Sequence, residues 1–220
     1  DLDSSVNKGY PVNCKKIETT IKRAFYVDQQ PIGKNFRSTI VTYLDIFNDI
    51  RDLFAETKMA KAKKISASDF SFNVEGGRCE CCLGTGYKRI EMSYLPDSFI
   101  LCPECNGDRF KKEVCRIQYK NNSITDILKK PINNIVEIFD DKPGISSKLQ
   151  CLIDIGLGYL ALGDMTSKLT GGEAQRVKLA KELGRNSKTK VMYIFDEPTS
   201  GLHKSDIKKI KELLIRLVEK

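Results

Sequence analysis

The sequence has no tryptophan, only one histidine, and no run of about 20 apolar residues of the kind that crosses a bilayer as a helix. Its polar N-terminal residues contain no apolar segment of a secretory signal. These absences argue against a membrane partner and predict a cytoplasmic protein. With 40% hydrophobic residues among 220, the chain can bury one good core or two smaller ones, so it is not a disordered tail.

Basic residues are in excess, because 37 Lys and Arg outnumber 29 Asp and Glu and give a net charge of +8. A basic protein suits a polyanionic partner such as nucleic acid, since cations that neutralise phosphates release condensed counterions. The basic residues are spread along the whole sequence, however. Charge alone therefore leaves a nucleic-acid partner and a solvated surface equally open.

The eight cysteines have no accompanying secretory signal, which favours metal or thiol chemistry over disulfides. Four of them form two Cys-x-x-Cys knuckles, Cys79 with Cys82 and Cys102 with Cys105. Such knuckles supply four thiolates to a structural Zn²⁺, and glycines after each pair allow the tight turns that this needs. An iron–sulfur cluster and a redox dithiol pair are the competing interpretations, and Cys81 is an alternative to its neighbour as ligand.

The segment between the knuckles, residues 87–101, alternates loosely and contains Pro96-Asp97. This pattern predicts two antiparallel strands with a turn near residues 95–98. The hairpin would carry Met92, Tyr94 and Leu95 at its tip, and Lys88 and Arg89 near its base. Lys88, Arg89 and Tyr94 are candidate DNA contacts, while packing of the tip on a neighbouring domain is the equal alternative.

The rest of the sequence predicts an α/β fold. An apolar run at residues 24–27 reads as a strand entering a loop, and residues 191–195 read as a buried strand. Amphipathic helices are predicted over residues 39–57, 173–183 and 205–218. Helix, strand and helix in succession near the C-terminus indicate an α/β layer.

Two motifs in this layer point to nucleotide chemistry. Gly171 and Gly172 directly precede a helix, whose free N–H groups and dipole make an anion site. Asp196 and Glu197 follow the apolar strand 191–195. Because ligands bind at the carboxyl ends of strands in such sheets, Asp196 is placed to hold Mg²⁺ and Glu197 to orient or deprotonate a water molecule.

These motifs resemble those of ABC ATPases: residues 169–175, Leu-Thr-Gly-Gly-Glu-Ala-Gln, look like an ABC signature, and residues 193–203 look like a Walker B strand and D-loop. Combined with the cysteine knuckles, the run Asp-Gln-Gln-Pro-Ile-Gly at residues 28–33 and Phe-Ser-Phe-Asn-Val at residues 70–74, they are similar to the UvrA family. Members of this family are ATPases of the bacterial UvrABC excinuclease, which acts in nucleotide excision repair and the SOS response to DNA damage.

The resemblance implies roles for individual residues. Gln29 would be the Q-loop glutamine and, with Glu197, a catalytic residue. The signature would grip the γ-phosphate of ATP held by the opposing nucleotide-binding domain. The implied nucleotide and Mg²⁺ contacts are Asp196, Thr170, Gly171, Gly172, Glu173 and Gln175. The implied metal ligands are Cys79, Cys82, Cys102 and Cys105.

Two parts of the family pattern are missing from the sequence. It contains no Gly-x-x-x-x-Gly-Lys-Ser/Thr phosphate loop, and His203 lies in the D-loop region, where it is not expected to be the switch histidine. In the family these parts lie upstream of Asp1 and downstream of Lys220. We therefore expect a fragment of the second nucleotide-binding half, which alone hydrolyses ATP negligibly because the phosphate cradle is absent.

The resemblance implies a partial ABC-ATPase nucleotide-binding domain with five segments. Core residues 1–38 hold the Q-loop, residues 39–74 begin a helical signature subdomain, residues 75–116 insert a zinc hairpin, residues 117–188 complete the signature subdomain, and core residues 189–220 hold the Walker B strand and D-loop. The implied cofactors are Zn²⁺, ATP and Mg²⁺.

The implied function is recognition of damaged double-stranded DNA under the control of ATP. A UvrA-like homodimer and a UvrB-like protein are the expected protein partners. The alternatives are a UvrA-like paralogue in drug resistance and a zinc-dependent DNA-binding module that works without nucleotide.

Overall fold

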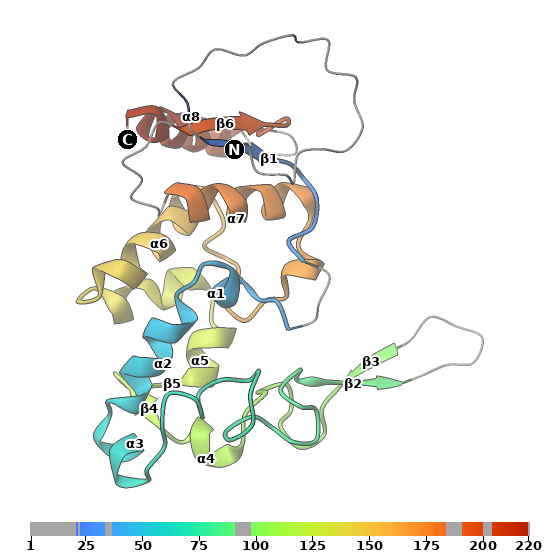
Figure 1. Cartoon of the computed structure of the whole chain (residues 1–220), viewed down its shortest axis with the longest axis vertical. Helices are drawn as coiled ribbons and strands as arrows, with labels where there is room; N and C mark the ends of the chain where they lie inside the picture. Colours follow the sequence, from blue (N-terminus) through green and yellow to red (C-terminus); the bar gives the residue numbers. More distant parts are fainter. Residues whose placement is uncertain are drawn as a thin grey trace.

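The computed structural model describes residues 21, 23–33, 37–90, 98–183, 191–199 and 204–219. Along the long axis of the molecule, Figure 1 shows a small parallel sheet near one end and helices from the middle to the other end, with a hairpin that projects sideways from the half opposite the sheet. The described residues include no helix with the length and apolar character needed to cross a membrane. The arrangement is the α/β fold predicted from the sequence.

The sheet pairs strands from opposite ends of the sequence. β1 (Arg23–Val27) and β6 (Val191–Phe195) run parallel, with Arg23 opposite Val191 and Val27 opposite Phe195. Their aromatic side chains stack across the pair, since the rings of Phe25 and Tyr193 lie 5.7 Å apart. Both strands were predicted, and β6 has the predicted bounds. The carboxyl ends of the two strands therefore lie side by side.

The prediction that residues 191–195 are a buried strand was wrong. Alternate residues of β6 face solvent, and Met192 and Ile194 are 44% and 46% exposed. The physical reason is that β6 has one partner strand among the described residues, and only the face that carries Tyr193 and Phe195 is partly covered. Helix α7 (Gly171–Leu183) packs against β1, and α8 (Lys204–Glu219) contacts α6 (Pro143–Asp154).

The middle of the molecule is a helical body with the main apolar core. It starts with α1 (Ile40–Tyr43) and α2 (Phe47–Ala55), which divide the single helix predicted over residues 39–57. The chain turns sharply at Asp45, where φ is +55°, a value that interrupts any helix. Hydrophobic periodicity continued across this break because both helices bury their apolar faces in one core.

The remaining elements complete this body. They are α3 (Lys58–Ala62), α4 (Lys112–Cys115), the short antiparallel pair β4 (Gln118–Tyr119) and β5 (Asn122–Ser123), α5 (Ile124–Lys129), and the 3₁₀ turns η2 (Ile132–Asn134), η3 (Val136–Phe139) and η4 (Thr166–Lys168). Pro143 opens α6 at a position where its missing N–H costs nothing. Pro143 therefore marks a helix start.

The segment between α3 and α4 holds the cysteines and the predicted hairpin. β2 (Tyr87–Ile90) pairs antiparallel with β3 (Ser98–Leu101), with Tyr87 opposite Leu101. The two strands project from the helical body (Figure 1). This confirms the predicted strand pair, whereas the predicted tip residues Met92, Tyr94 and Leu95 lie outside the described residues.

Candidate functional site

The four knuckle cysteines meet at one buried point. Their sulfur atoms all lie within 4.8 Å of one another, with 3.9 Å between Cys79 and Cys102 and 3.6 Å between Cys82 and Cys105. A disulfide would require about 2.05 Å. Four sulfurs bound tetrahedrally to Zn²⁺ at about 2.3 Å lie roughly 3.8 Å apart, so the observed spacing fits a Cys₄ zinc site.

The backbone around the cluster is shaped to place the sulfurs. The N–H of Gly86 donates to the Cys82 sulfur at 3.3 Å. Gly84 has a φ of +79°, and a β-carbon there would lie 1.8 Å from the carbonyl oxygen of Phe72, so no other residue fits without movement. Burial raises the pKa of Cys79 and Cys105. Burial opposes ionisation of Cys102 too, but backbone N–H donors from Cys105 and Glu104 bring its pKa to about 6.

Cys81 does not join the sulfur cluster. It is half-buried and packs against the outside of the group formed by the other four. Of the two alternatives left open by the sequence, the geometry favours the pair with matched Cys-x-x-Cys spacing.

The cysteine module, which comprises the two knuckles and the hairpin between them, is tied to the helical body by basic side chains. Arg109 is 9% exposed, donates to the carbonyl of Gly163 at 3.0 Å, and lies over the ring of Phe72. Lys168 lies over the ring of Tyr87, 5.0 Å from its centre. These contacts reach the segment that leads directly into the signature. No sequence pattern predicts these contacts, because nothing local indicates which lysine or arginine will bridge two segments.

The base of the hairpin presents basic and apolar groups together. Lys88, Arg89 and Ile90 on β2 are exposed, and Phe99, Ile100 and Leu101 on β3 are 41%, 46% and 52% exposed. Exposed apolar groups next to cations suit a partner that offers both phosphates and stacking surfaces, or a neighbouring protein surface. Tyr94, the third predicted DNA contact, lies outside the described residues.

The signature residues form the start of α7. The side chain of Thr170 accepts from the N–H of Glu173, and the Glu173 carboxylate accepts from the Thr170 N–H at 2.8 Å. This reciprocal pair is a capping box, which satisfies free N–H groups at a helix start. The hydroxyl of Tyr159 donates to the other carboxylate oxygen of Glu173.

The bonds to Glu173 change the titration of both partners. Burial alone would raise the pKa of Glu173, but hydrogen bonds from Tyr159 and Thr170 lower it overall. Burial and the bond to Glu173 raise the pKa of Tyr159 to about 12. Tyr159 was missed in the sequence, where no motif marks it. Glu173, which was predicted to contact nucleotide, therefore forms hydrogen bonds that shape the start of the signature helix.

The first signature glycine lies against the predicted Q-loop glutamine. A β-carbon on Gly171 would come within 3.2 Å of both the β-carbon and the carbonyl oxygen of Gln29. Such a distance is tighter than ordinary contact, so glycine permits this approach. Gly172 follows in the first turn of α7. The structure therefore brings together two predicted site elements that lie 142 positions apart in the sequence.

The predicted carboxylates stand at the end of the sheet. Asp196 directly follows β6, its N–H donates to the Val27 carbonyl at 3.4 Å, and both Asp196 and Glu197 are exposed. Glu197 has a φ of +46°, in the left-handed region that side chains other than glycine rarely adopt. Such strain collects at functional sites, where it fixes the direction of a side chain.

The remaining predicted contact, Gln175, points inward. It is 4% exposed, and its amide donates to the carbonyls of Val27 and Asp196. Lys178, one turn further along α7, bonds the loop after β1 and was missed in the sequence. The only sequence feature that could have indicated this contact is the three-residue spacing from Gln175, which places both side chains on the same face of the helix.

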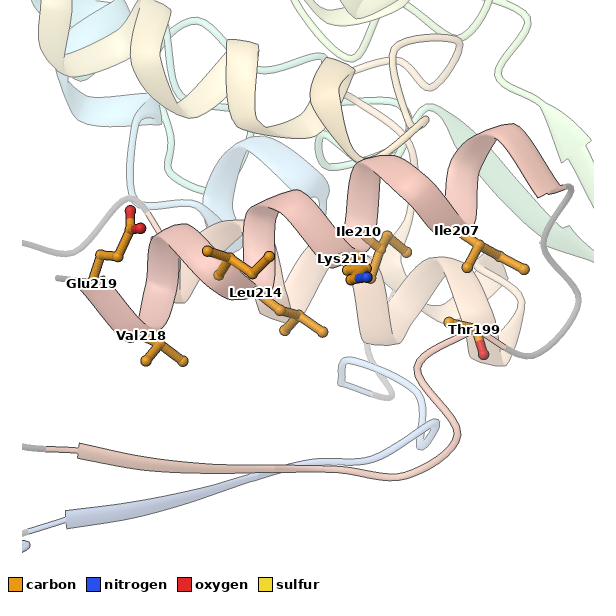
Figure 2. A pocket seen from close by; sticks show the side chains of 8 residues that line it. Thr199, Ile207, Ile210, Lys211, Leu214, Val218 and Glu219 are labelled. Carbon is orange, nitrogen blue, oxygen red and sulfur yellow. The ribbon is translucent and has the colours of Figure 1, made fainter.

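A separate cavity of about 660 Å³ lies along α8. Figure 2 shows its lining, which consists mostly of aliphatic side chains of α8, with Thr199 at one end. A triphosphate needs clustered N–H donors or cations, whereas Lys211 is the only cation among the described residues of this lining. The predicted site residues Gln29, Gly171, Asp196 and Glu197 lie outside this lining.

Comparisons with known proteins agree with this geometry, although no protein-family model matches the chain. The chain is 49% identical over 193 residues to UvrABC system protein A of Staphylococcus aureus strain COL, which covers 88% of the chain and 20% of that protein. It is 45% identical over 216 residues to the Clostridium acetobutylicum protein of the same name, covering 98% and 23%.

The fold is also similar to a solved structure. The crystal structure of UvrA2 from Deinococcus radiodurans has a TM-score of 0.85 and 42% identity, and the match covers 91% of this chain and 24% of that one. At this identity the likeness extends beyond the general fold. The chain spans about a fifth of the length of the curated relatives that it matches.

Proposed function

Because the chain belongs to the UvrA family and corresponds to only part of its members, we propose that it supplies the signature, the Q-loop and the Walker B carboxylates of an ATP-hydrolysing DNA-repair protein. One observation carries this proposal. The N-terminus of α7, Gln29 and the Asp196-Glu197 pair meet at the carboxyl ends of two parallel strands, where α/β sheets bind their ligands.

The residues divide the work of phosphoryl transfer between them. Asp196 holds Mg²⁺, and Glu197 orients or deprotonates the attacking water. Gln29 senses the metal and the water from the neighbouring strand. Thr170, Gly171 and Gly172 offer N–H groups and the positive end of the α7 dipole to the γ-phosphate of ATP held by an opposing nucleotide-binding domain.

The four cysteines hold a structural zinc ion. Zn²⁺ supplies a rigid link between the two knuckles, and a closed set of four thiolates leaves no position for substrate. Cys79, Cys82, Cys102 and Cys105 would hold the ion, and the hairpin of β2 and β3 rises from the framework that they form. With a metal bound by these four residues, the direction of the hairpin would be fixed.

The hairpin and the net positive charge support binding to double-stranded DNA. Lys88 and Arg89 contact phosphates, which position a protein on DNA without reading its sequence. Damage would then be sensed through the altered deformability of the duplex. A homodimer and a UvrB-like partner complete the proposed repair assembly.

The decisive experiment is the substitution Glu197→Gln in the full-length protein. ATP binding should persist, because the glutamine keeps the size of the side chain, while hydrolysis falls by two or more orders of magnitude, since general-base assistance contributes about 10²–10⁴-fold. Glu137→Gln, which removes an exposed carboxylate in η3, is the matched control. Normal turnover in Glu197→Gln would refute the proposal.

A further inference from the structure

Helix α7 carries a side-chain amide, that of Gln175, whose two N–H donors are both engaged. The amide nitrogen of Gln175 donates to the carbonyl of Val27 at 3.2 Å and to the carbonyl of Asp196 at 2.5 Å, and the side chain is 4% exposed. A primary amide has two N–H donors, so both are used. The role of Gln175 must therefore follow from the two backbone carbonyls to which it donates.

The two carbonyls that it holds mark the ends of the strands. Val27 is the last residue of β1, and Asp196 is the first residue after β6. Val27 and Phe195 form the last pair of the parallel register. Gln175 thus bridges the strands just beyond the end of their ladder and fixes the backbone from which the Asp196 and Glu197 side chains emerge.

Lys178 does the same for the loop that carries Gln29. Its ammonium donates to the carbonyls of Asp28 at 3.1 Å and Gln30 at 2.8 Å, and it pairs with the Asp28 carboxylate. An ammonium has three N–H donors, and these three acceptors use them. Because residues 28 and 30 flank Gln29, Lys178 holds the backbone on both sides of the glutamine.

Resting on the proposed ATPase function, we propose that Gln175 and Lys178 are positioning residues that hold Gln29, Asp196 and Glu197 in the arrangement needed for hydrolysis and tie them to the signature helix. In this role neither side chain needs a contact with nucleotide. A helix of 13 residues moves as a unit, and its first residue already contacts Gln29. Any displacement of the signature therefore reaches both strand ends through these bonds.

The test uses Gln175→Leu and Lys178→Met in the full-length protein. The kcat for ATP should fall at least about tenfold, because misplacing a catalytic group by about 1 Å can cost up to ~100-fold. The KM for ATP should change less than about threefold, because the lost interactions act on the transition state. Lys178→Arg, which keeps a cation and several donors, should recover part of kcat.

Lys181→Met is the matched control for structural damage. Lys181 lies on the same helix, its side chain is 18% exposed against 19% for Lys178, and it pairs with Asp45 at 2.8 Å. Among the described residues its ion pair is with Asp45 and not with the strand ends, so its loss reports the cost of removing a half-buried ion pair. If Gln175→Leu does not fold, Gln175→Asn, which keeps the amide but shortens its reach, replaces it.

The outcomes separate this inference from the proposed function. A fall in kcat no larger than in Lys181→Met, or a parallel rise in KM, overturns the positioning role. Normal kcat in these variants beside an inactive Glu197→Gln overturns the positioning role alone. Normal turnover in Glu197→Gln overturns the proposed function, and the positioning role with it.

Discussion

Removal of zinc should unfold the cysteine module and leave the helical body intact. The reason lies in the composition of the two buried clusters. The cluster that surrounds the knuckles contains four cysteines, with Cys81 packed against it, whereas the helical body has a large aliphatic and aromatic core. Without metal the module has little apolar surface to hold it together.

The magnitudes support local unfolding. Ordering residues 79–86 and 102–107 costs roughly 14–28 kcal/mol at about 1–2 kcal/mol per residue. Burial of four small side chains returns only about 4 kcal/mol at roughly 1 kcal/mol each. A structural zinc site contributes about 10–16 kcal/mol in zinc-finger peptides, which closes most of the difference.

The assay is metal content together with limited proteolysis of the purified chain, before and after treatment with a chelator. We expect about one zinc per chain, the stoichiometry of a single Cys₄ site. After chelation, cleavage should appear within residues 79–107 while far-ultraviolet circular dichroism keeps its helical signal. Cys82→Ser should reproduce the chelated state.

Cys81→Ser is the control, because Cys81 lies next to Cys82 but outside the sulfur cluster. It should keep its zinc and its resistance to protease. Retention of zinc by Cys82→Ser, or an unchanged cleavage pattern after chelation, would refute the assignment of the four ligands.

Two further predictions concern the signature and the hairpin. Tyr159→Phe should raise the pKa of Glu173 toward its ordinary value, because the bond that helps to lower it is removed. A carboxyl group whose pKa is lowered by folding stabilises the fold at pH values above its unfolded pKa, and this stability is lost as the pH falls. Acid unfolding should therefore begin at higher pH in Tyr159→Phe. An unchanged midpoint of acid unfolding would contradict this. Replacing Lys88 and Arg89 by Ala in the full-length protein should reduce the slope of log affinity for duplex DNA against log salt concentration by roughly 2, at about 1 per phosphate contact. The control variant, Lys63→Ala with Lys64→Ala on an exposed turn, should keep the original slope. Equal slopes in the two double variants would show that the hairpin base does not contact phosphates.

The features that the sequence predicted well are those determined by neighbouring residues. The knuckles were predicted because both ligands of each pair lie three positions apart, and the strand at residues 191–195 because a short apolar run ends in charged residues. Helix α8 was predicted within one residue at each end because its apolar positions keep a helical period. Local spacing carries such information directly.

The features that were missed depend on contacts between distant segments. The bond from Gln175 to Val27 spans 148 positions, and that from Lys178 to Asp28 spans 150. No periodicity marks such pairs, so Gln175 was interpreted through its motif, as a nucleotide contact. The exposed face of β6 was missed for the same reason, because an apolar run does not reveal how many strands flank it.

Local rules also fail at several described residues other than glycine whose φ is positive. Asp45 and Glu197 both adopt positive φ, which sequence alone assigns to glycine or asparagine. At Asp45 the turn lets α1 and α2 bury their faces in one core, so packing explains the strain. At Glu197 the side chain is exposed and packing explains nothing. The bond from Gln175 to the carbonyl of Asp196 holds the backbone immediately before this position, so the turn at Glu197 starts from a fixed point, at the residue proposed here to act on water.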